Sequence, residues 1–395
     1  MGDILLTVSG VIDRARQERA TEGRAPRTDY GEIARALGAD LLDYEMARRR
    51  HGAWGRLLEG LGGPALLLAW AVYRVRHRYR ILLTDGEQVG IPLACLLKLG
   101  GRGRRGARHL MIVHTLLPRK KRVFFDVLGI QSAIDTFLVY STWQQHFIRE
   151  RWRIAATRVL HIPFMVDTRF FAPELVDAGR PQPLARTIAA APGRARMPRG
   201  NMPRLQPGHD REGYSAGDRR PLICAVGLEC RDYPTLIRAV RDLPVRVVIA
   251  ASSPWSRRAD TTQQVTVPEN VTVAQFDLWN LRRLYAQSRL MVMPLYKVYF
   301  QAGVTALLEA MAMALPIICS RVPGQTDVVV EGETGLYVPP GDPSALRAAI
   351  VRLLADPAEA ERMGRAGRER VVREMSLDGY VTRLRGVIEG LLEGE

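Results

Sequence analysis

A bend and a carboxylate in the second half of the chain have residue types and a spacing that could bind a ligand. The bend Gln301-Ala302-Gly303 precedes a run of helix formers, Thr305 to Ala314, and Glu309 lies about one turn into that run. Free N–H groups and the positive end of the macrodipole at a helix start form a seat for phosphate. A carboxylate one turn further on accepts hydrogen bonds from two neighbouring hydroxyls of a sugar ring. The stretch therefore offers a diphosphate seat and a hold on ribose, although a strand–turn–helix with one Glu occurs in any α/β protein.

Strands and helices alternate through both halves of the chain, which predicts parallel sheets covered on both faces. The strands expected in the first half are Ile4–Ser9, Ala39–Tyr44, Arg80–Thr84, His109–Val113, Thr136–Tyr140 and Val159–Ile162. Those expected in the second half are Leu222–Val226, Val245–Ala250, Val271–Ala274, Leu290–Met293, Pro316–Cys319 and Gly335–Val338. The polar, Arg-rich stretch from Gly10 to Asp29 is predicted to be a long loop, and Thr326 to Glu331 a short helix.

The length of 395 residues is too great for one ordinary core, and we expect two doubly wound, Rossmann-like α/β domains. The predicted parts are an N-terminal domain at 1–172, a Pro/Gly/Arg-rich linker or insertion at 173–220, a C-terminal domain at 221–375 and a final helix at 376–395. In such sheets ligands bind beyond the carboxyl ends of the strands, so the cleft between two facing domains is the expected site.

The excess of positive over negative charge is confined to the first half of the chain. Residues 1–220 hold 37 Lys+Arg and 21 Asp+Glu, a net +16, whereas residues 221–395 hold 20 of each. The basic, Leu-rich helical stretch from Trp54 to Arg78 and the cluster from Arg119 to Arg122, followed by Val123-Phe124-Phe125, suit an anionic membrane surface. A nucleic-acid backbone is the alternative partner, and an ordinary solvated basic face the plain one.

The location predicted from the sequence is cytoplasmic. No secretory signal precedes the first strand, the longest apolar run is too short to span a bilayer, and the four cysteines lie in apolar runs without metal-ligand spacing. With the basic first half, these features predict a protein that stays at the inner face of the plasma membrane without crossing it.

The second half resembles the retaining glycosyltransferases of family 4, also called group 1 glycosyltransferases, which have the GT-B fold. The run ALLEAMAMALPIICSRVPGQTDVVVEGETGLYVPPGD is similar to the donor-site signature of that family, and ICAVGLECRDYPTLIRAV to its first nucleotide-domain strand and helix. The runs SAIDTFLVYSTWQQHFI and HIPFMVDTRFFAP resemble, more weakly, its last acceptor-domain strands and the crossing into the linker. The resemblance implies two domains facing across a cleft, with the C-terminal helix packing back toward the N-terminal domain.

The resemblance also assigns roles to individual residues. Donor binding falls to Gly227, Arg231, Gln301, Ala302, Gly303, Val304, Thr305 and Glu309, and catalysis to His114, Arg231 and Gln301. Glu309 would hold the ribose hydroxyls, Arg231 would neutralise the diphosphate, and His114 would face the transferring sugar from the acceptor side. A fixed guanidinium and helix N–H groups stabilise a leaving diphosphate, so the implied reaction needs no metal and no cofactor.

Three positions depart from the family pattern. Gln301 replaces a second Glu, Leu228 stands where an Arg often follows the strand glycine, and Ser9-Gly10-Val11 replaces a Gly-Gly turn. The first hypothesis is a retaining hexosyltransferase that moves a sugar from a nucleotide-sugar to a glycan, a lipid-linked acceptor or a polysaccharide precursor. A nucleotide-sugar epimerase of the same fold is the second hypothesis. A catalytically silent basic relative that binds nucleic acid or membrane is the third, although no motif for specific nucleic-acid reading is present.

Overall fold

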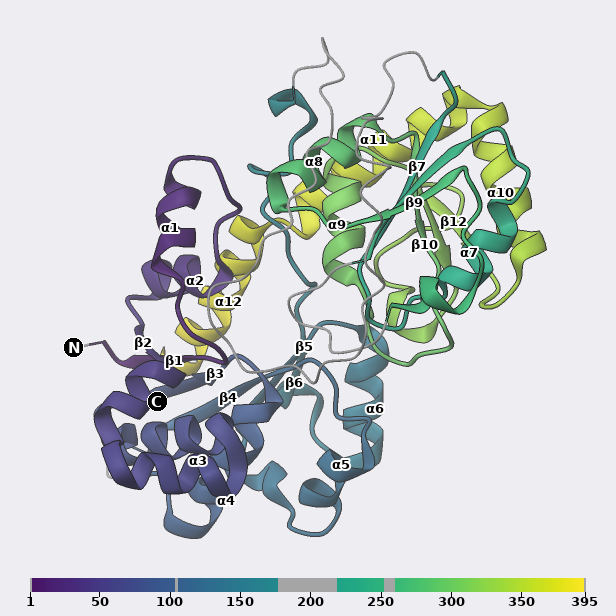
Figure 1. Cartoon of the computed structure of the whole chain (residues 1–395). Coiled ribbons are helices and arrows are strands. Elements are labelled where there is room, and N and C mark those ends of the chain that lie inside the picture. Colours follow the sequence, from purple (N-terminus) through teal and green to yellow (C-terminus); the bar gives the residue numbers. More distant parts are fainter. Residues whose placement is uncertain (1, 104–105, 177–218, 252–259, 394–395) are drawn as a thin grey trace.

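The computed structural model describes residues 2–103, 106–176, 219–251 and 260–393. Two parallel sheets, one in each half of the chain, form the centres of two domains (Figure 1). This arrangement confirms the predicted α/β architecture of two doubly wound domains. The linker or insertion expected at 173–220 lies almost wholly outside the described residues.

The N-terminal sheet has the strand order β2-β1-β3-β4-β5-β6, with every neighbouring pair parallel. Its strands are β1 (Ile4–Val8), β2 (Asp40–Asp43), β3 (Ile81–Thr84), β4 (Arg108–Val113), β5 (Thr136–Val139) and β6 (Val159–His161). Its helices are α1 (Arg14–Thr21), α2 (Asp29–Leu37), α3 (Tyr44–Val75), α4 (Glu87–Gly100), α5 (Arg119–Asp126) and α6 (Thr142–Trp152). Buried side chains of α3, α4, α5 and α6 form the core on one face of the sheet, and α2 packs on the other.

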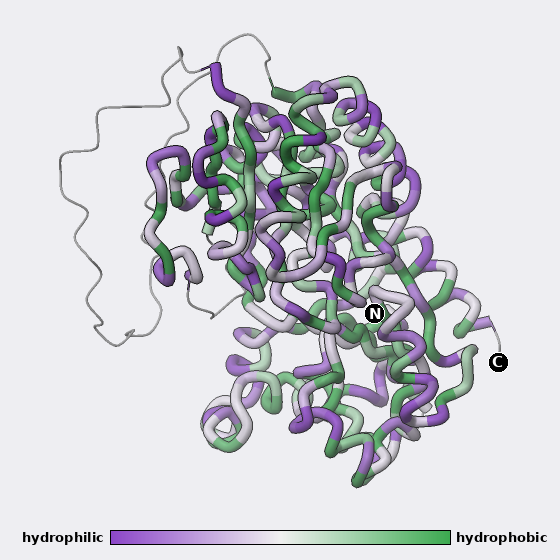
Figure 2. Tube along the Cα trace, turned by 90° about the vertical axis from the view of Figure 1, so that its right-hand side faces the viewer, coloured by the Kyte–Doolittle hydropathy of each residue, from purple (hydrophilic) through white to green (hydrophobic). Residues whose placement is uncertain are grey.

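The C-terminal sheet has the order β12-β11-β10-β7-β8-β9 and is also parallel throughout. Its strands are β7 (Leu222–Val226), β8 (Arg246–Ala250), β9 (Val271–Ala274), β10 (Leu290–Met293), β11 (Ile317–Ser320) and β12 (Gly335–Val338). The helices are α7 (Tyr233–Val240), α8 (Leu278–Gln287), α9 (Val304–Ala312), α10 (Pro343–Ala355), α11 (Pro357–Glu374) and α12 (Leu377–Glu393). The side chains of these strands belong to two buried core clusters, and Figure 2 shows hydrophobic and hydrophilic segments alternating along the trace.

The last helix, α12, leaves the C-terminal domain and packs on the N-terminal sheet, as predicted. Its buried residues Leu377, Tyr380, Leu384 and Ile388 join the core that contains Ile4, Leu6 and Ile81. Within the part of the chain that the structure describes, none of the helices combines the length and apolar content of a membrane span.

Two local predictions were wrong. The stretch from Gly10 to Asp29 contains α1, which Asp13 caps by accepting a hydrogen bond from the Arg16 backbone N–H at 2.9 Å. No residue of α1 is buried. Its sequence therefore has no periodic apolar positions from which a helix could be predicted. The short helix expected from Thr326 to Glu331 is instead a turn after a 3-10 helix, Pro323–Gln325.

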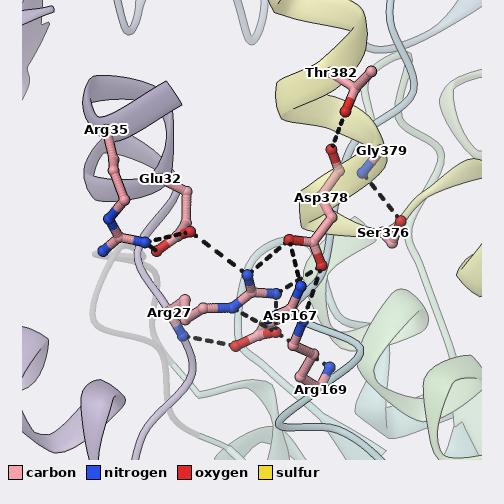
Figure 3. A network of polar contacts seen from close by, with 9 residues as sticks. All are labelled: Arg27, Glu32, Arg35, Asp167, Arg169, Ser376, Asp378, Gly379 and Thr382. Atoms are coloured by element: carbon pink, nitrogen blue, oxygen red, sulfur yellow. Dashed lines mark hydrogen bonds and ion pairs between the residues drawn. The ribbon is translucent and has the colours of Figure 1, made fainter. Parts of the chain in front are cut away.

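The chain crosses between the domains twice, and the two crossings are paired. The Val166 N–H donates to the Met375 carbonyl at 3.0 Å, and the Leu377 N–H donates to the Val166 carbonyl at 2.9 Å. Arg27, from the N-terminal domain, holds both crossings at this point (Figure 3).

The guanidinium of Arg27 bonds carboxylates from both crossings. It donates to Asp167 at 2.7 Å and to Asp378 at 2.8 Å, and the Arg27 backbone N–H donates to Asp167 at 2.8 Å. The Asp167 side chain is only 4% exposed. The hydrogen bonds from Arg27 lower the pKa of Asp378. A partly buried ion cluster thus joins α12, the first crossing and the segment before α2 (Figure 3).

Candidate active site

Arg231 is the centre of the candidate site in the C-terminal domain. It is 2% exposed and lies in the turn between β7 and α7. Its Nε donates to the Val226 carbonyl at 2.8 Å and its Nη1 to the Glu229 carbonyl at 2.7 Å. In the described residues it forms no ion pair with a carboxylate. Burial lowers the pKa of Arg231, but a guanidinium keeps its proton in proteins, so the site holds an uncompensated positive charge.

Two glycines make room for this guanidinium. Gly227 and Gly303 have φ values of 101° and 80°, in the left-handed region that favours glycine. A Cβ on either glycine would overlap the Arg231 guanidinium, with Nη2 as the nearest atom. Both glycines predicted as donor-binding residues are therefore required for the close approach of Arg231 to the backbone.

Gly303 is also the N-cap of α9, and no side chain caps that helix. Its first N–H groups and the positive end of its dipole therefore lie beside the Arg231 guanidinium. Thr305 is exposed at the first turn, whereas Ala302 and Val304 are buried. A buried guanidinium beside an uncapped helix start is the arrangement that binds a phosphate or diphosphate.

Glu309 lies on the same helix and is 7% exposed. The Tyr285 hydroxyl, on α8, donates to Glu309 Oε2 at 3.0 Å. Burial raises the pKa of Glu309 to about 7, although the hydrogen bond from Tyr285 and the charge of Arg16 oppose that rise. Tyr285 leaves one Glu309 oxygen without a partner among the described residues. Glu309 is thus placed to accept further hydrogen bonds at the same end of the domain as Arg231.

Gln301 lies in the bend before α9 and presents a buried Oε1 atom without a hydrogen-bond partner in the described residues. A hydrogen bond from the turn after β11 stabilises the bend, since Gln325 Nε2 donates to the Ala302 carbonyl at 2.6 Å. A Cβ on Gly324 would overlap the Phe300 backbone. The Gly324-Gln325 step therefore fixes the bend, and Gln301 Oε1 is left free to accept a hydrogen bond from a ligand hydroxyl.

A cavity of about 360 Å³ separates the two domains beside this bend. Its walls are Tyr140, Thr142, His161, Pro163, Phe164, Gln301, Val304, Leu308, Thr326, Asp327, Val328, Arg370, Glu374 and Met375. The rim is closed by a direct contact between the domains, because the Thr142 N–H and hydroxyl each donate to Asp327 at 2.7 Å. Trp143 extends that contact, with its ring 5.7 Å from that of Tyr299.

His114 follows β4 and is exposed on the N-terminal side of the cleft. Its Nε2 donates to the Asp85 carbonyl at 3.0 Å, which leaves Nδ1 as the acceptor of the neutral ring. Its backbone N–H donates to Glu87 at 2.9 Å. His114 does not line the cavity; its ring lies 5.5 Å from the Tyr140 ring, which does. The structure thus places Gln301 and Val304 in the cavity wall and Gly227 and Gly303 against Arg231, whereas His114 lies one aromatic ring away from the cavity.

The carboxylates beside His114 differ in their electrostatics. Burial opposes ionisation of Glu87, but the charges of His114 and Lys121 outweigh it, so the pKa of Glu87 is lowered. Burial raises the pKa of Asp85, although its carboxylate accepts hydrogen bonds from Thr7 and Ser9. Asp85 thereby ties Ser9, where the family has its Gly-Gly turn, to the end of β3.

Three residues of this region were not predicted from the sequence. Tyr285 is one aromatic among the apolar residues of an amphipathic helix, and Asp85 follows a strand without a recognisable motif. Arg16 belongs to α1, yet its charge acts on Glu309 from the other domain. Its Nε atom is buried without a partner in the described residues. Leu228, where the family often has an Arg, packs instead against the core of the C-terminal domain.

The chain is similar in sequence to known glycosyltransferases. Residues 225–356 match the family model described as glycosyl transferases group 1. The chain is 29% identical, over 85% of its length and 75% of the relative, to a GDP-mannose-dependent alpha-(1-6)-phosphatidylinositol monomannoside mannosyltransferase of Mycolicibacterium smegmatis. It is 36% identical to an alpha-maltose-1-phosphate synthase of Mycobacterium tuberculosis, but over only 28% of each protein.

Solved structures resemble the whole fold at low sequence identity. Sucrose-phosphate synthase from Thermosynechococcus elongatus matches over 100% of both chains, with a TM-score of 0.69 and 20% identity. Anabaena HepE in complex with UDP and glucose matches over 98% of this chain and 100% of its own, with a TM-score of 0.65 and 13% identity. These likenesses show the shared two-domain fold.

Proposed function

We propose that the chain is a group 1 glycosyltransferase, which transfers a sugar from a nucleoside diphosphate to a hydroxyl of a glycan or lipid-linked acceptor. Residues 225–356 match the model of that family, and the whole chain shares its two-domain GT-B fold with solved glycosyltransferases. The transfer retains the anomeric configuration and uses no metal ion. The family and fold agree with the resemblance inferred from the sequence, and the relatives named above are transferases and synthases rather than epimerases.

The observation that carries the proposal is the buried Arg231 guanidinium at the uncapped start of α9. A positive charge without a carboxylate partner is costly in a folded protein unless an anion completes the site. The diphosphate is an anion of the right kind, because the helix N–H groups and the guanidinium offer several donors to its oxygens. Glu309, further along the same helix, accepts the ribose hydroxyls.

The same groups assist the departure of the nucleoside diphosphate. Negative charge grows on the leaving phosphate as the bond to the sugar breaks, and Arg231 and the α9 dipole stabilise that charge in place. Fixed cationic and N–H donors supply this stabilisation from the protein itself, which supports a reaction without a metal ion. Retention requires the acceptor hydroxyl to approach from the face that the phosphate leaves. Gln301 holds a sugar hydroxyl through its free Oε1, and His114 faces the sugar from the acceptor domain.

Arg16 is proposed as a second cation for the donor. The family often supplies an Arg after the first strand glycine, but Leu228 occupies that position here and packs against the core. The charge of Arg16, in the opposite domain, lowers the pKa of Glu309, and its Nε atom is buried without a partner in the described residues. We expect Arg16→Gln to weaken nucleoside diphosphate binding roughly tenfold, the value of one charge-assisted hydrogen bond, while Arg14→Gln, an exposed neighbour on the same helix, leaves it unchanged.

The names of the relatives suggest candidates for the nucleotide base of the donor and for the acceptor. The mannosyltransferase relative is named as GDP-mannose-dependent, and HepE was solved with UDP and glucose. The acceptor of the mannosyltransferase is named as a phosphatidylinositol monomannoside, which favours a lipid-linked acceptor here. We further propose that the protein works in the cytoplasm at the inner face of the plasma membrane, where such acceptors and an anionic surface are found together.

A panel of nucleoside diphosphates and their sugars tests the donor site by thermal unfolding. A ligand at about 100 times its Kd stabilises the folded protein by roughly 2.7 kcal/mol, so the correct nucleoside diphosphate raises the Tm by several degrees. Arg231→Met and Glu309→Gln should each abolish that rise. Absence of a rise with every nucleoside diphosphate, in a folded wild-type protein, would refute the donor site.

The chemistry is tested on the product. NMR of the transferred sugar shows whether the anomeric configuration of the donor is kept, and an inverted product would refute retention. Activity should persist in EDTA, whereas a loss that a divalent ion restores would refute metal independence. Conversion of the donor to its epimer without any acceptor would identify the protein as an epimerase.

A further inference from the structure

An apolar stripe faces solvent on a short helix within α3. The backbone departs from helical angles at Gly52 and again at Gly62, which isolates residues 53–61 as a separate segment. Trp54, Leu57 and Leu61 in this segment are 72%, 53% and 74% exposed. Their spacing of three and four residues places them on one face of the helix.

The opposite face of the same segment is already packed. Gly55 is buried, and a Cβ there would meet the Leu67 side chain at 3.4 Å. Glu59 forms an ion pair with Arg48 from the preceding part of α3, with Arg48 Nε donating at 2.9 Å. The apolar stripe is therefore an outer surface of the domain and not an incompletely buried core seam.

A second apolar group lies at the end of α5 and the end of α4. Val123, Phe124, Val127 and Leu128 are at least 36% exposed, and Leu99 is 88% exposed. Lys98, beside Leu99, donates to the Leu128 carbonyl at 2.7 Å, which joins the two helix ends.

All of these residues belong to one layer of helices. Figure 1 shows α3, α4 and α5 on the side of the N-terminal sheet opposite to α2 and α12. Among the described residues, every large hydrophobic side chain that is exposed on the N-terminal domain before the crossing lies on this layer or in the turn after α5. We call the outer side of α3, α4 and α5 the basic–apolar surface.

The helices of this layer carry more positive than negative side chains. The helices α3, α4 and α5 contain 10 Lys+Arg and 4 Asp+Glu, a net +6, and the whole stretch from residue 44 to residue 128 has a net charge of +12. Arg50, Arg56, Arg119 and Lys120 are exposed and form no ion pair with a carboxylate in the described residues. Cations that flank exposed Trp, Leu and Phe side chains are the pattern of helices that lie in a membrane interface.

We propose that the basic–apolar surface docks on an anionic lipid bilayer, with Trp54, Leu57 and Leu61 inserted among the lipid headgroups and acyl chains. This inference deepens the proposed function, on which it rests for the membrane location, by naming the surface that makes the contact. A second copy of the chain is a poor occupant, because a symmetric dimer through this surface would bring two strongly positive layers together. An apolar ridge also fits a nucleic-acid backbone badly, since that backbone is bound through charge.

Cosedimentation of the full chain with lipid vesicles tests the surface. Wild-type protein should bind vesicles containing phosphatidylglycerol, bind phosphatidylcholine vesicles weakly, and be released by salt. Replacing Trp54, Leu57 and Leu61 together by Ser should reduce binding at least tenfold, since each loses apolar area buried in lipid.

A charge variant and a matched control complete the set. Arg50→Gln and Arg56→Gln should each reduce binding about fivefold, the value of one cation at an anionic surface. Val351→Ser with Val372→Ser should leave binding unchanged, because these side chains are 45% exposed but lie on the C-terminal domain.

Three outcomes would overturn the docking surface: wild-type protein that ignores phosphatidylglycerol vesicles, equal losses in the Val351/Val372 control, or a dimer that dissociates in the Trp54/Leu57/Leu61 variant. The same variants are assayed for the thermal shift with nucleoside diphosphates, which reports a folded donor site. A retained shift with lost vesicle binding is the expected result. A wild type that binds vesicles but no nucleoside diphosphate would instead refute the proposed function and leave the docking surface standing.

Discussion

Glu309→Gln should stabilise the fold at high pH while it removes the donor site. The folded protein holds the pKa of Glu309 near 7, against an ordinary value of 4.5, because the carboxyl group is buried. At 1.36 kcal/mol per unit of pKa, this difference corresponds to about 3 kcal/mol. A raised folded pKa means that the folded state prefers the protonated acid. The stability associated with Glu309 is therefore complete below pH 4.5 and is lost as the pH rises through 7.

Gln cannot ionise, so the variant escapes this loss. Its amide oxygen still accepts the hydrogen bond from Tyr285, whereas its new N–H groups carry a constant cost where they find no partner. The measured quantity is thus a double difference: the free energy of unfolding of Glu309→Gln minus that of the wild type, at pH 8 relative to pH 4.5. We expect about 3 kcal/mol in favour of the variant.

Urea denaturation at several pH values between 4.5 and 8 gives this number. Glu333→Gln is the matched control, because Glu333 is exposed in the same domain and should show little pH-dependent difference. Calorimetry with the nucleoside diphosphate that stabilises the wild type completes the experiment. Wild-type affinity should fall as the pH drops below 7, since ribose hydroxyls need the ionised acceptor, and the variant should bind weakly at every pH. Parallel stability curves for the wild type and Glu309→Gln would refute the electrostatic reasoning.

Two further substitutions test the geometry around the site. Gly303→Ala should displace the Arg231 guanidinium, because a Cβ there overlaps it, and should weaken nucleoside diphosphate binding at least tenfold in calorimetry. Gly341→Ala is the control. Gly341 has a φ of 76° and open space around it, so this substitution introduces backbone strain alone and should leave binding intact. Arg27→Met should lower the free energy of unfolding by about 3 kcal/mol in urea, since it leaves Asp167 buried without its partner. Adding Asp167→Asn should restore part of that loss, and no recovery would contradict a charge-based cause.

The C-terminal half of the site could be predicted because its signals are local. The bend at Gln301–Gly303, the helix after it and Glu309 occur within one short stretch, and strand–helix alternation places that stretch at the carboxyl edge of a parallel sheet. The resemblance added Arg231, which no spacing within the sequence connects to Gly303. The structure then explains both glycines, because each lies against the same guanidinium.

The N-terminal half could be predicted less well because its contacts are not local. The helix α1 buries no residue, so its sequence lacks the apolar period that would predict a helix. The basic cluster at Arg119–Arg122 suggested a docking surface, but only the structure shows that Phe124 is exposed while Phe125 is buried. The exposed stripe of α3 likewise lies on a segment that non-helical backbone angles at Gly52 and Gly62 separate from the rest of the helix.

The change from Arg to Leu at position 228 and the placement of Arg16 together alter how the donor is held. In the proposed donor site, the C-terminal domain supplies Arg231 and the start of α9 to the phosphate. A second cation on α1 belongs to the other domain, so its contribution depends on how the domains are held at the paired crossings. Donor binding and domain closure are then thermodynamically coupled. A diphosphate that contacts both cations binds the closed arrangement more tightly than the open one, and therefore favours closure. Loosening the crossings with Arg27→Met should therefore weaken donor binding more in the wild type than in Arg16→Gln, and equal effects in both backgrounds would show that the cations act independently.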